Sequence, residues 1–475
     1  MKRNLTMLTD LYELTMMNGY FKSGIAECEA VFDLFFRQKG QINYAVAAGL
    51  QQAVEYIENL HFDEGDIEYL RSLNMFGEDF LEYLSDFRFT GDIYAVKEGE
   101  IVFPMEPIII VKAPLIQAQF IETALLNIIN HQTLIATKAS RMTTAAGEGK
   151  IVEFGLRRAQ GPDAGIYGSR AALIGGAMGT SNVLSGRMFD IPVKGTHAHS
   201  WVLSFPTELD AFNAFADVYP DSCLLLVDTY DTLKSGIPNA IKVFDRLKKE
   251  GHKPVGIRLD SGDLAYLSKK AREMLDAAGY PDALVFGGND IDENVIASLN
   301  SQGAKIDMYG IGTKLITSED MPSLGGVYKL AMIKRSGAEI PKLKKSNSIE
   351  KITNPGFKTL YRIYDKETGM AFADLIALKG EEIPKPLTLV HEVERWKKTE
   401  LKDYDIKELL VKVMEKGERI YDFPSVSEIS AYRKQSLDTF WEEYKRLKNP
   451  HIHKVDLSDS LYKLKQKLLN DAYVE

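Results

Sequence analysis

Histidine and carboxylate side chains that could carry out catalysis follow several short apolar runs of the sequence. The stretch Gly195-Thr196-His197-Ala198-His199-Ser200 comes just after the run at 191–193, and Asp228-Thr229-Tyr230-Asp231-Thr232 follows 224–227. A third stretch, Arg258-Leu259-Asp260-Ser261-Gly262-Asp263, follows 255–257. A histidine in this setting can act as a ligand, a base or a nucleophile. The carboxylates can orient it, hold magnesium or bind ribose hydroxyls.

Helix capping is the competing interpretation of these carboxylates. Asp260 with Ser261, and Asp231 with Thr232, each precede a predicted helix and have the side chains that cap helices. Capping leaves Arg258 unexplained. A zinc site is disfavoured, because no third ligand lies near the two histidines.

Two further patterns suit an anionic ligand. In Phe154-Gly155-Leu156-Arg157-Arg158 the ring can stack on a flat partner while the guanidinium groups meet negative charge, although solvated arginines at a strand end are an alternative. The glycine-rich loops Gly287-Gly288-Asn289-Asp290 and Gly310-Ile311-Gly312-Thr313-Lys314 can offer backbone N–H groups to a phosphate. The first loop lacks the G-x-G-x-x-G spacing, so a dinucleotide-binding fold is disfavoured.

Alternating strands and helices must position these residues. From about residue 150, apolar runs alternate with helical stretches, which predicts a parallel sheet with crossover helices. We expect an α/β fold, an irregular α/β barrel of mostly parallel strands, with its active site at the carboxyl ends of the strands. An α+β N-terminal domain and a C-terminal extension accompany it.

The predicted domains are an N-terminal domain over 1–140, completed by part of 346–440, a barrel over 141–345 and a C-terminal region over 346–475. The last barrel strand is predicted at 327–333, and helices are predicted near 402–415, 426–447 and 457–470.

Composition narrows the class of protein. The 475 residues include 58 Lys and Arg against 67 Asp and Glu, a net charge of −9, which argues against a general binder of nucleic acid or of anionic membranes. No apolar run approaches the roughly 18 residues of a membrane span, and the N-terminus lacks the apolar core of a signal peptide. Cys28 and Cys223 give no disulfide framework. We therefore expect a cytoplasmic, soluble protein.

The chain resembles the nicotinate phosphoribosyltransferases over nearly its whole length. No single matching stretch is specific, but their joint occurrence is. The matching stretches are Thr9-Asp10-Leu11-Tyr12-Glu13-Leu14-Thr15, Phe35-Phe36-Arg37, 154–163, Gly179-Thr180-Ser181-Asn182, 195–200, 228–231, 258–263, 309–315 and Phe423-Pro424-Ser425.

The resemblance implies a reaction. Nicotinate, phosphoribosyl pyrophosphate, ATP and water would give nicotinate mononucleotide, pyrophosphate, ADP and phosphate, the first step of NAD salvage from nicotinate. His199 would be the active-site histidine that ATP phosphorylates, and Asp228 the acid that pairs with it. Magnesium would bind near Asp260. His197 falls at a variable position and is given no catalytic role.

The resemblance also implies binding roles and a homodimer with shared active sites. Phe154 and Tyr12, the latter from the other subunit, would sandwich the pyridine ring, and Arg258 and Asp260 would lie beside the ring and the ribose. Arg157 and Arg37 would contact the pyrophosphate end. The 5-phosphate would lie in the loops of Gly288, Asn289, Gly310, Gly312 and Thr313.

Ser181 bears on which base is used. The related nicotinamide enzyme carries an acid at this position, where a carboxylate would repel nicotinate at a cost of several kcal/mol. A serine can instead donate a hydrogen bond to the carboxylate of nicotinate. Leu156 also departs from the aromatic residue of the nicotinamide enzyme.

Several alternatives remain at the level of sequence. Nicotinamide or quinolinate phosphoribosyltransferase is the nearest, although the quinolinate enzyme is shorter and more basic at its site. An unrelated barrel isomerase or aldolase would need a Schiff-base lysine or a proton-shuttling acid. A non-catalytic binding protein on the same barrel would be expected to have lost part of the set Asp228, His199, Asp260 and Arg258.

Overall fold

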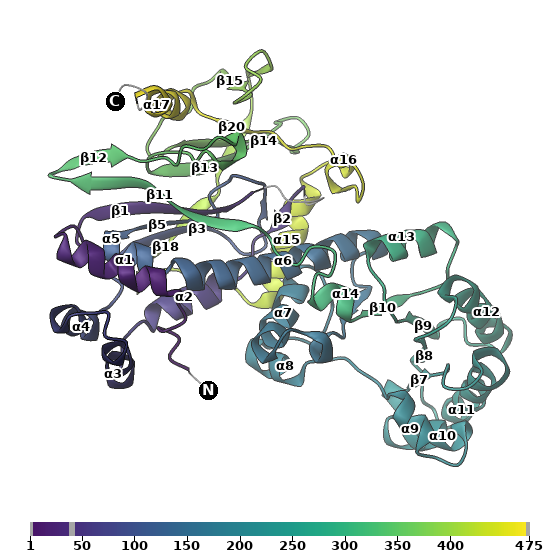
Figure 1. Ribbon diagram of the computed structural model, residues 1–475. Helices are drawn as coiled ribbons and strands as arrows, with labels where there is room; N and C mark the ends of the chain where they lie inside the picture. Colours follow the sequence, from purple (N-terminus) through teal and green to yellow (C-terminus); the bar gives the residue numbers. More distant parts are fainter. Residues whose placement is uncertain (1–2, 38–42, 472–475) are drawn as a thin grey trace. The chain divides into compact units, whose positions relative to one another are not determined.

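The computed structural model describes residues 3–37 and 43–471, which form two compact units (Figure 1). The first contains residues 1–134, 323–424 and 431–475, and the second contains 135–322 and 425–430. Two helices, α6 (Glu122–Ala146) and α15 (Val426–Asp438), contribute residues to both. No helix among the described residues is long and apolar enough to cross a membrane.

A seven-stranded sheet forms the centre of the first unit, in the order β12-β11-β1-β5-β3-β18-β19. Its interior strand β1 (Glu29–Phe36) is buried along almost all of its length, as its run of Val, Leu and Phe requires. It pairs antiparallel with β5 and β11. The other strands of this sheet are β3 (Asp92–Val96), β5 (Ile109–Pro114), β11 (Gly326–Arg335), β12 (Ala338–Pro341), β18 (Leu410–Glu415) and β19 (Glu418–Arg419).

Smaller sheets and helices complete this unit. The four-stranded sheet has the order β17-β13-β14-β20, and the pairs β15-β16 and β2-β4 form two-stranded sheets. The strands are β2 (Ala45–Val46), β4 (Ile101–Val102), β13 (Lys358–Tyr364), β14 (Ala371–Leu378), β15 (Leu387–Val390), β16 (Lys398–Leu401), β17 (Asp405–Glu408) and β20 (Val455–Leu457). The helices are α1 (Leu11–Lys22), α2 (Leu50–Glu58), α3 (Glu64–Ser72), α4 (Glu78–Ser85), α5 (Leu115–Phe120), α16 (Glu442–Lys445) and α17 (Asp459–Asn470).

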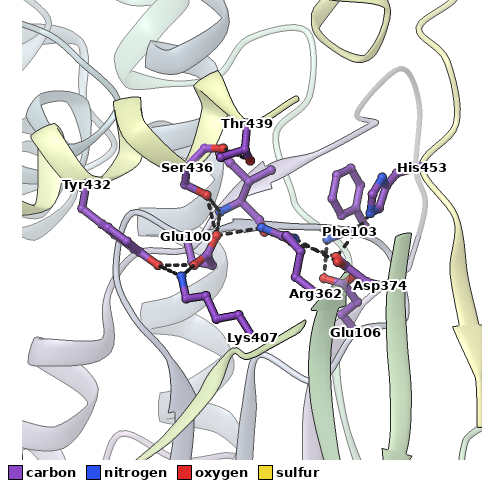
Figure 2. A network of polar contacts seen from close by, with 11 residues as sticks. Glu100, Phe103, Glu106, Arg362, Asp374, Lys407, Tyr432, Ser436, Thr439 and His453 are labelled. Atoms are coloured by element: carbon purple, nitrogen blue, oxygen red, sulfur yellow. Dashed lines mark hydrogen bonds and ion pairs between the residues drawn. The ribbon is translucent and has the colours of Figure 1, made fainter. Parts of the chain in front are cut away.

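A buried ionic network joins distant segments of the first unit (Figure 2). The side chain of Arg362 is 0% exposed and forms ion pairs of 2.7 Å with both Glu100 and Asp374. Tyr432 and Ser436 donate hydrogen bonds to Glu100. Removing one partner from such a network leaves a buried charge unpaired, so these contacts hold the segments together.

Glu106 extends this network as an acid that keeps its proton. It is 0% exposed, and burial, with the negative charge of Asp374 beside it, raises its pKa well above the usual range. Burial also lowers the pKa of His453, whose ring stacks on Phe103 with the centroids 4.1 Å apart.

The second unit is built on a five-stranded parallel sheet in the order β6-β10-β9-β8-β7. The strands are β6 (Ile151–Glu153), β7 (Leu224–Leu226), β8 (Gly256–Leu259), β9 (Leu284–Gly287) and β10 (Met308–Ile311). The helices are α7 (Pro162–Ile174), α8 (Val183–Phe189), α9 (His199–Leu203), α10 (Glu208–Val218), α11 (Ile237–Lys249), α12 (Leu264–Ala277), α13 (Glu293–Ser301) and α14 (Thr313–Ile316). The predicted α/β class and parallel sheet are confirmed.

Closure of that sheet into a barrel stays a prediction. Beyond β6 the chain continues the sheet only through isolated parallel bridges, Glu153 with Thr180 and Thr180 with Val193. Thr196 Oγ1 then donates a hydrogen bond to the carbonyl of Leu224 in β7. The predicted boundaries at 140 and 345 stay predictions as well.

Two elements differ from their sequence-based assignment. The strand expected to end the barrel at 327–333 lies in β11, which pairs antiparallel with β1 in the first unit. The region 402–415, where a helix was expected, instead forms two strands of different sheets, β17 and β18. In β18, Leu410 lies opposite Val96 of β3. In the second case Leu409, Leu410 and Val413 have helical spacing, but pairing with a buried strand decides the conformation.

Candidate active site

The residues singled out in the second unit lie where its parallel strands end. Phe154 follows β6, Asp228 lies two residues after β7, Asp260 follows β8, Gly288 follows β9 and Gly312 follows β10. Because the strands are parallel and hydrogen-bonded to one another, these loops meet at one edge of the sheet. These loops therefore converge, as expected for a parallel sheet.

Asp228 forms the centre of the set. Its side chain is 1% exposed. Its Oδ2 atom accepts hydrogen bonds from the backbone N–H of Asp260 at 2.8 Å and from Ser261 Oγ at 2.7 Å. Its Oδ1 atom is buried without a hydrogen-bond partner among the described residues and lies 4.0 Å from His199 Nε2. One oxygen is therefore held by the loop after β8, and the other faces the histidine.

His199 is the first residue of α9, and its side chain is 41% exposed. Its Nδ1 atom lies 3.1 Å from Thr229 Oγ1. Contacts through both ring nitrogens orient the imidazole, while its exposure leaves it open to a reactant.

His197 is a structural histidine. It is buried against Phe212 and Phe215, and burial lowers its pKa to about 4. Its Nε2 atom accepts a hydrogen bond of 3.3 Å from the backbone N–H of Leu226, which requires the neutral ring. These contacts agree with giving His197 no catalytic role.

Arg258 links the acids to the aromatic ring. Its Nη2 atom lies 2.6 Å from Asp260 Oδ1, and its guanidinium carbon is 5.4 Å from the centroid of the Phe154 ring. Its Nε atom is buried with no hydrogen-bond partner in the described part of the chain. Phe154, Arg258, Asp260, Asp228 and His199 thus form one continuous chain of contacts.

The glycines of the two loops give room to their neighbours. A Cβ atom added at Gly310 would lie 2.6 Å from Phe154 Cδ2, and one added at Gly288 would lie 2.3 Å from Asp260 Oδ1. The N–H of Gly288 already donates to the carbonyl of Leu259, so this glycine contributes space more than a donor. Asn289 has a φ of 83°, and Thr313 is the first residue of α14.

The structure separates capping carboxylates from the others. Asp231 accepts hydrogen bonds from the N–H groups of Leu233 and Lys234, and Asp263 caps α12 through the N–H of Tyr266. Capping therefore explains Asp231 and Asp263. Asp260 caps no helix, and its carboxylate is held by Arg258 instead.

Ser181 and Arg157 lie on two loops near the end of β6. Ser181 donates its backbone N–H to the carbonyl of Glu153 at 2.9 Å, beside Phe154. Arg157 is exposed in the short 3-10 helix Leu156–Arg158. Arg157 is thus exposed to solvent, and Ser181 is partly exposed.

Tyr12 and Arg37 belong to the first unit. Tyr12, near the start of α1, is 46% exposed, and burial together with the charges of Glu122 and Glu13 raises its pKa. The Nε and Nη2 atoms of Arg37 are buried with no hydrogen-bond partner within 3–37 and 43–471. A guanidinium group in this state suits an anion.

The acids suit magnesium only as an ion shared with a substrate. No group of three or more His, Cys, Asp or Glu side chains that could hold a metal occurs among the described residues. Asp228 and Asp260 are adjacent, and Mg²⁺ is often bound by one or two carboxylates together with substrate phosphates and water. The donors present fit that arrangement.

Two contributors were missed in the sequence. Thr229 follows Asp228 and gave no signal beyond its neighbour. Glu153 reads as the end of an apolar strand, yet it is a fully buried acid that accepts hydrogen bonds from the loops on either side. A charged residue closing a buried strand was the only hint available.

Known families and proteins match the chain throughout. The N-terminal domain of nicotinate phosphoribosyltransferase matches residues 7–130, the nicotinate phosphoribosyltransferase family matches 149–361 and the C-terminal domain matches 357–465. A nicotinate phosphoribosyltransferase of Bacillus subtilis is 48% identical over 474 residues, which cover 99% of this chain and 96% of that protein. The human nicotinate phosphoribosyltransferase is 32% identical, with 96% of this chain and 95% of that protein covered. The crystal structure of human nicotinic acid phosphoribosyltransferase superposes with a TM-score of 0.86 at 31% identity, covering 97% of this chain and 99% of the other.

Proposed function

The chain belongs to the nicotinate phosphoribosyltransferase family, and from that premise we propose that it transfers the phosphoribosyl group of phosphoribosyl pyrophosphate to nicotinate. Nicotinate mononucleotide and pyrophosphate are the products, and the reaction begins NAD salvage from nicotinate. The observation that carries this proposal is the unbroken series of contacts from Phe154 through Arg258, Asp260 and Asp228 to His199.

The chemistry proceeds at C1 of the ribose. The pyridine nitrogen forms a bond to this carbon as the bond from C1 to the pyrophosphate oxygen breaks, and the electron pair leaves with pyrophosphate. Positive charge develops on the ribose, and the carboxylates of Asp260 and Asp228 stabilise it. Stacking on Phe154, and on Tyr12 of the partner subunit, aims the nitrogen at the carbon.

The substrate groups are distributed over the strand ends. Ser181 donates a hydrogen bond to the carboxylate of nicotinate, and Arg157 and Arg37 meet the pyrophosphate. The loops of Gly288, Asn289, Gly310, Gly312 and Thr313 hold the 5-phosphate. Two guanidinium nitrogens of Arg37, Nε and Nη2, have no hydrogen-bond partner among the described residues, which supports its part in this assignment.

ATP coupling would act through His199. A ring nitrogen attacks the γ-phosphorus of ATP, a nitrogen–phosphorus bond forms and ADP leaves with the broken bond's electrons. Water later hydrolyses the phosphohistidine, which releases phosphate. The unpaired Oδ1 of Asp228, 4.0 Å from Nε2, supports this role because it can stabilise a charged imidazole.

Magnesium is proposed to enter with the phosphorylated substrates. Asp260 and Asp228 would hold it, and when bound it would neutralise charge on the leaving pyrophosphate. Arg258, by holding Asp260 Oδ1, would fix the carboxylate that binds this ion.

The remaining proposals concern the assembly. We propose a homodimer with shared active sites, supported by the exposed apolar side chains Leu8, Leu11 and Tyr12 around the start of α1 and Val183, Leu184 and Met188 on α8. Closure of the parallel sheet as an irregular barrel is supported by the bridges at Thr180 and Val193. A cytoplasmic location is supported by two free cysteines, and the domains are proposed to divide near 140 and 345.

Product analysis tests the function. Purified protein is incubated with nicotinate, phosphoribosyl pyrophosphate, Mg²⁺ and ATP, and the nucleotide product is separated and identified by its mass. Nicotinamide and quinolinate serve as controls in parallel. Nicotinate mononucleotide as the main product supports the proposal. Faster turnover of nicotinamide or quinolinate would replace it with one of those reactions.

A further inference from the structure

Glu153, the last residue of β6, is a buried acid that the proposed chemistry does not use. It is 0% exposed. Burial raises its pKa, and hydrogen bonds from Thr180, Gly155 and Ser169 oppose that rise. An acid buried this completely is unfavourable unless its contacts are well formed, so the contacts indicate what it does.

The side chain of Glu153 binds the loops on both sides of it. The backbone N–H of Gly155 donates a hydrogen bond to Oε1, which fixes the turn carrying Phe154. Thr180 Oγ1 donates to Oε2 at 2.5 Å, and Ser169 Oγ lies 3.1 Å from the same oxygen.

The main chain of Glu153 reinforces the same two connections. Its N–H donates to the carbonyl of Gly179 at 2.9 Å, and its carbonyl accepts from the N–H of Ser181 at 2.9 Å. Thr180 Oγ1 in turn accepts a hydrogen bond of 3.0 Å from the N–H of Asn182. Ser181 is therefore held from both neighbours in the sequence by a network centred on Glu153.

We propose that Glu153 is the positioning residue that fixes Ser181 relative to Phe154, and so sets how the carboxylate and ring of nicotinate are held. This inference rests on the proposed function. Glu153 does not touch the substrate. It acts through Phe154, its sequence neighbour, and through Thr180, which carries Ser181 next to it. A buried acid that only stabilises the fold would affect all substrates alike.

Thr180 offers a matched pair of variants for the test. Thr180→Val keeps the shape of the side chain and removes the hydroxyl, whereas Thr180→Ser keeps the hydroxyl. A hydrogen bond to an acid is worth enough to change binding about tenfold to a hundredfold. We expect Thr180→Val to raise the KM for nicotinate by about that factor, with the KM for phosphoribosyl pyrophosphate and the midpoint of thermal unfolding close to wild type. Thr180→Ser should resemble the wild type.

A double-variant cycle with Glu153→Gln links the effect to this acid. Glu153→Gln leaves one side-chain oxygen, which the backbone N–H of Gly155 needs as its acceptor, so the NH₂ group faces Thr180 and the hydrogen bond that Thr180 donates is lost. Both substitutions then remove the same contact, and Glu153→Gln combined with Thr180→Val should raise the KM for nicotinate by less than the product of the single effects. Multiplicative effects, an unchanged KM for nicotinate in Thr180→Val, or equal rises in both KM values with lowered thermal stability would each overturn the proposal. Failure of the proposed function is recognised separately, because the wild type would then neither bind nor convert nicotinate, and the role of Glu153 would fail with it.

Discussion

At the scale of single residues, the two carboxylate oxygens of Asp228 have different partners. Oδ2 accepts two hydrogen bonds from the loop after β8, whereas Oδ1 faces His199 and has no hydrogen-bond partner in the described part of the chain. A buried acceptor without a donor is costly, and the cost falls when a charged imidazole approaches it. We therefore expect this oxygen to stabilise a phosphorylated histidine.

Replacing the histidine should uncouple ATP from transfer. We expect His199→Ala to fold normally and to make nicotinate mononucleotide at the rate of wild type without ATP, because no nitrogen remains to accept the phosphoryl group. The measurement is product formation with and without ATP. His252→Ala removes a histidine paired with Asp221 outside the site and should keep the stimulation. Equal stimulation of His199→Ala and wild type would remove His199 from the mechanism.

The choice of base should depend on the charge at position 181. We expect Ser181→Asp to lower kcat/KM for nicotinate by at least about a thousandfold, because like charges in a pocket cost several kcal/mol. Ser181→Ala, which removes only the hydroxyl, should lower it by about tenfold. Steady-state kinetics with nicotinate and nicotinamide provide the comparison. Unchanged kcat/KM for nicotinate in Ser181→Asp would show that the carboxylate binds elsewhere.

At the scale of elements, the loops work because their glycines let neighbouring strands approach. β10 passes the Phe154 ring so closely that a methyl group at Gly310 would lie 2.6 Å from a ring carbon. The ring must then move, because the added Cβ is fixed to the backbone of β10 and its nearest neighbours all belong to the ring.

Gly310→Ala should therefore raise the KM for nicotinate by about tenfold, because the ring shifts away from its stacking position and loses a contact worth roughly 1 kcal/mol or more. Gly19→Ala in α1 is the control, since no atom lies within 4 Å of the added Cβ, and it should leave the kinetics unchanged. Nicotinate saturation curves at fixed phosphoribosyl pyrophosphate measure both. Wild-type KM in Gly310→Ala would mean that the ring position does not matter for binding.

At the scale of the whole molecule, two features depend on segments far apart in the chain. One is the buried ionic network of the first unit, which joins segments between Glu100 and His453 (Figure 2). The other is the proposed dimer, in which Tyr12 of one subunit completes the site of its partner.

Within the network, Glu106 should contribute a stability that falls as the pH rises. Because burial and Asp374 raise the pKa of Glu106, the folded chain keeps a proton that the unfolded chain loses near pH 4.3. Its contribution is complete below about pH 4.3 and is lost as the pH rises through the folded pKa.

Glu106→Gln mimics the protonated acid and should flatten this dependence. The free energy of unfolding is measured with urea at several pH values between 7 and 9. This range is chosen because the lowered pKa of His453 makes stability rise with pH only near and below 6.5. We expect the free energy of unfolding of the wild type to fall more steeply with rising pH than that of the variant, because only the wild type has the raised pKa of Glu106. Glu367→Gln, a substitution at an exposed position, is the control, and its free energy of unfolding should depend on pH as that of the wild type does. If the stability of Glu106→Gln depended on pH as that of the wild type does, Glu106 would not keep a proton in the folded chain.

Subunit mixing tests the shared site. Tyr12→Ala and Arg258→Ala should each be nearly inactive, and refolding them together should restore about a quarter of wild-type activity, because half of the dimers are mixed and each mixed dimer has one intact site. Activity of the mixture, compared with each variant refolded alone, is the readout. No recovery, with mixed dimers verified by mass spectrometry, would place Tyr12 in its own subunit's site.

The sequence by itself determined the parallel sheet and the kinds of residues at its strand ends. Apolar runs of strand length that alternate with helical stretches favour a parallel sheet, and the carboxyl ends of its strands then meet at one edge. The family resemblance was equally a property of the sequence, and the comparisons confirm it.

Only the tertiary structure decided which partners these residues take. Asp231 and Asp260 look alike in sequence, yet one caps a helix and the other is held by Arg258. The run at 327–333 could end a parallel sheet or join an antiparallel one, and it pairs with β1. Glu153 became a link between two loops only once they lay beside it. Local sequence sets conformation through short-range sterics and burial, whereas hydrogen-bond partners lie tens to hundreds of residues away and are chosen when the chain packs.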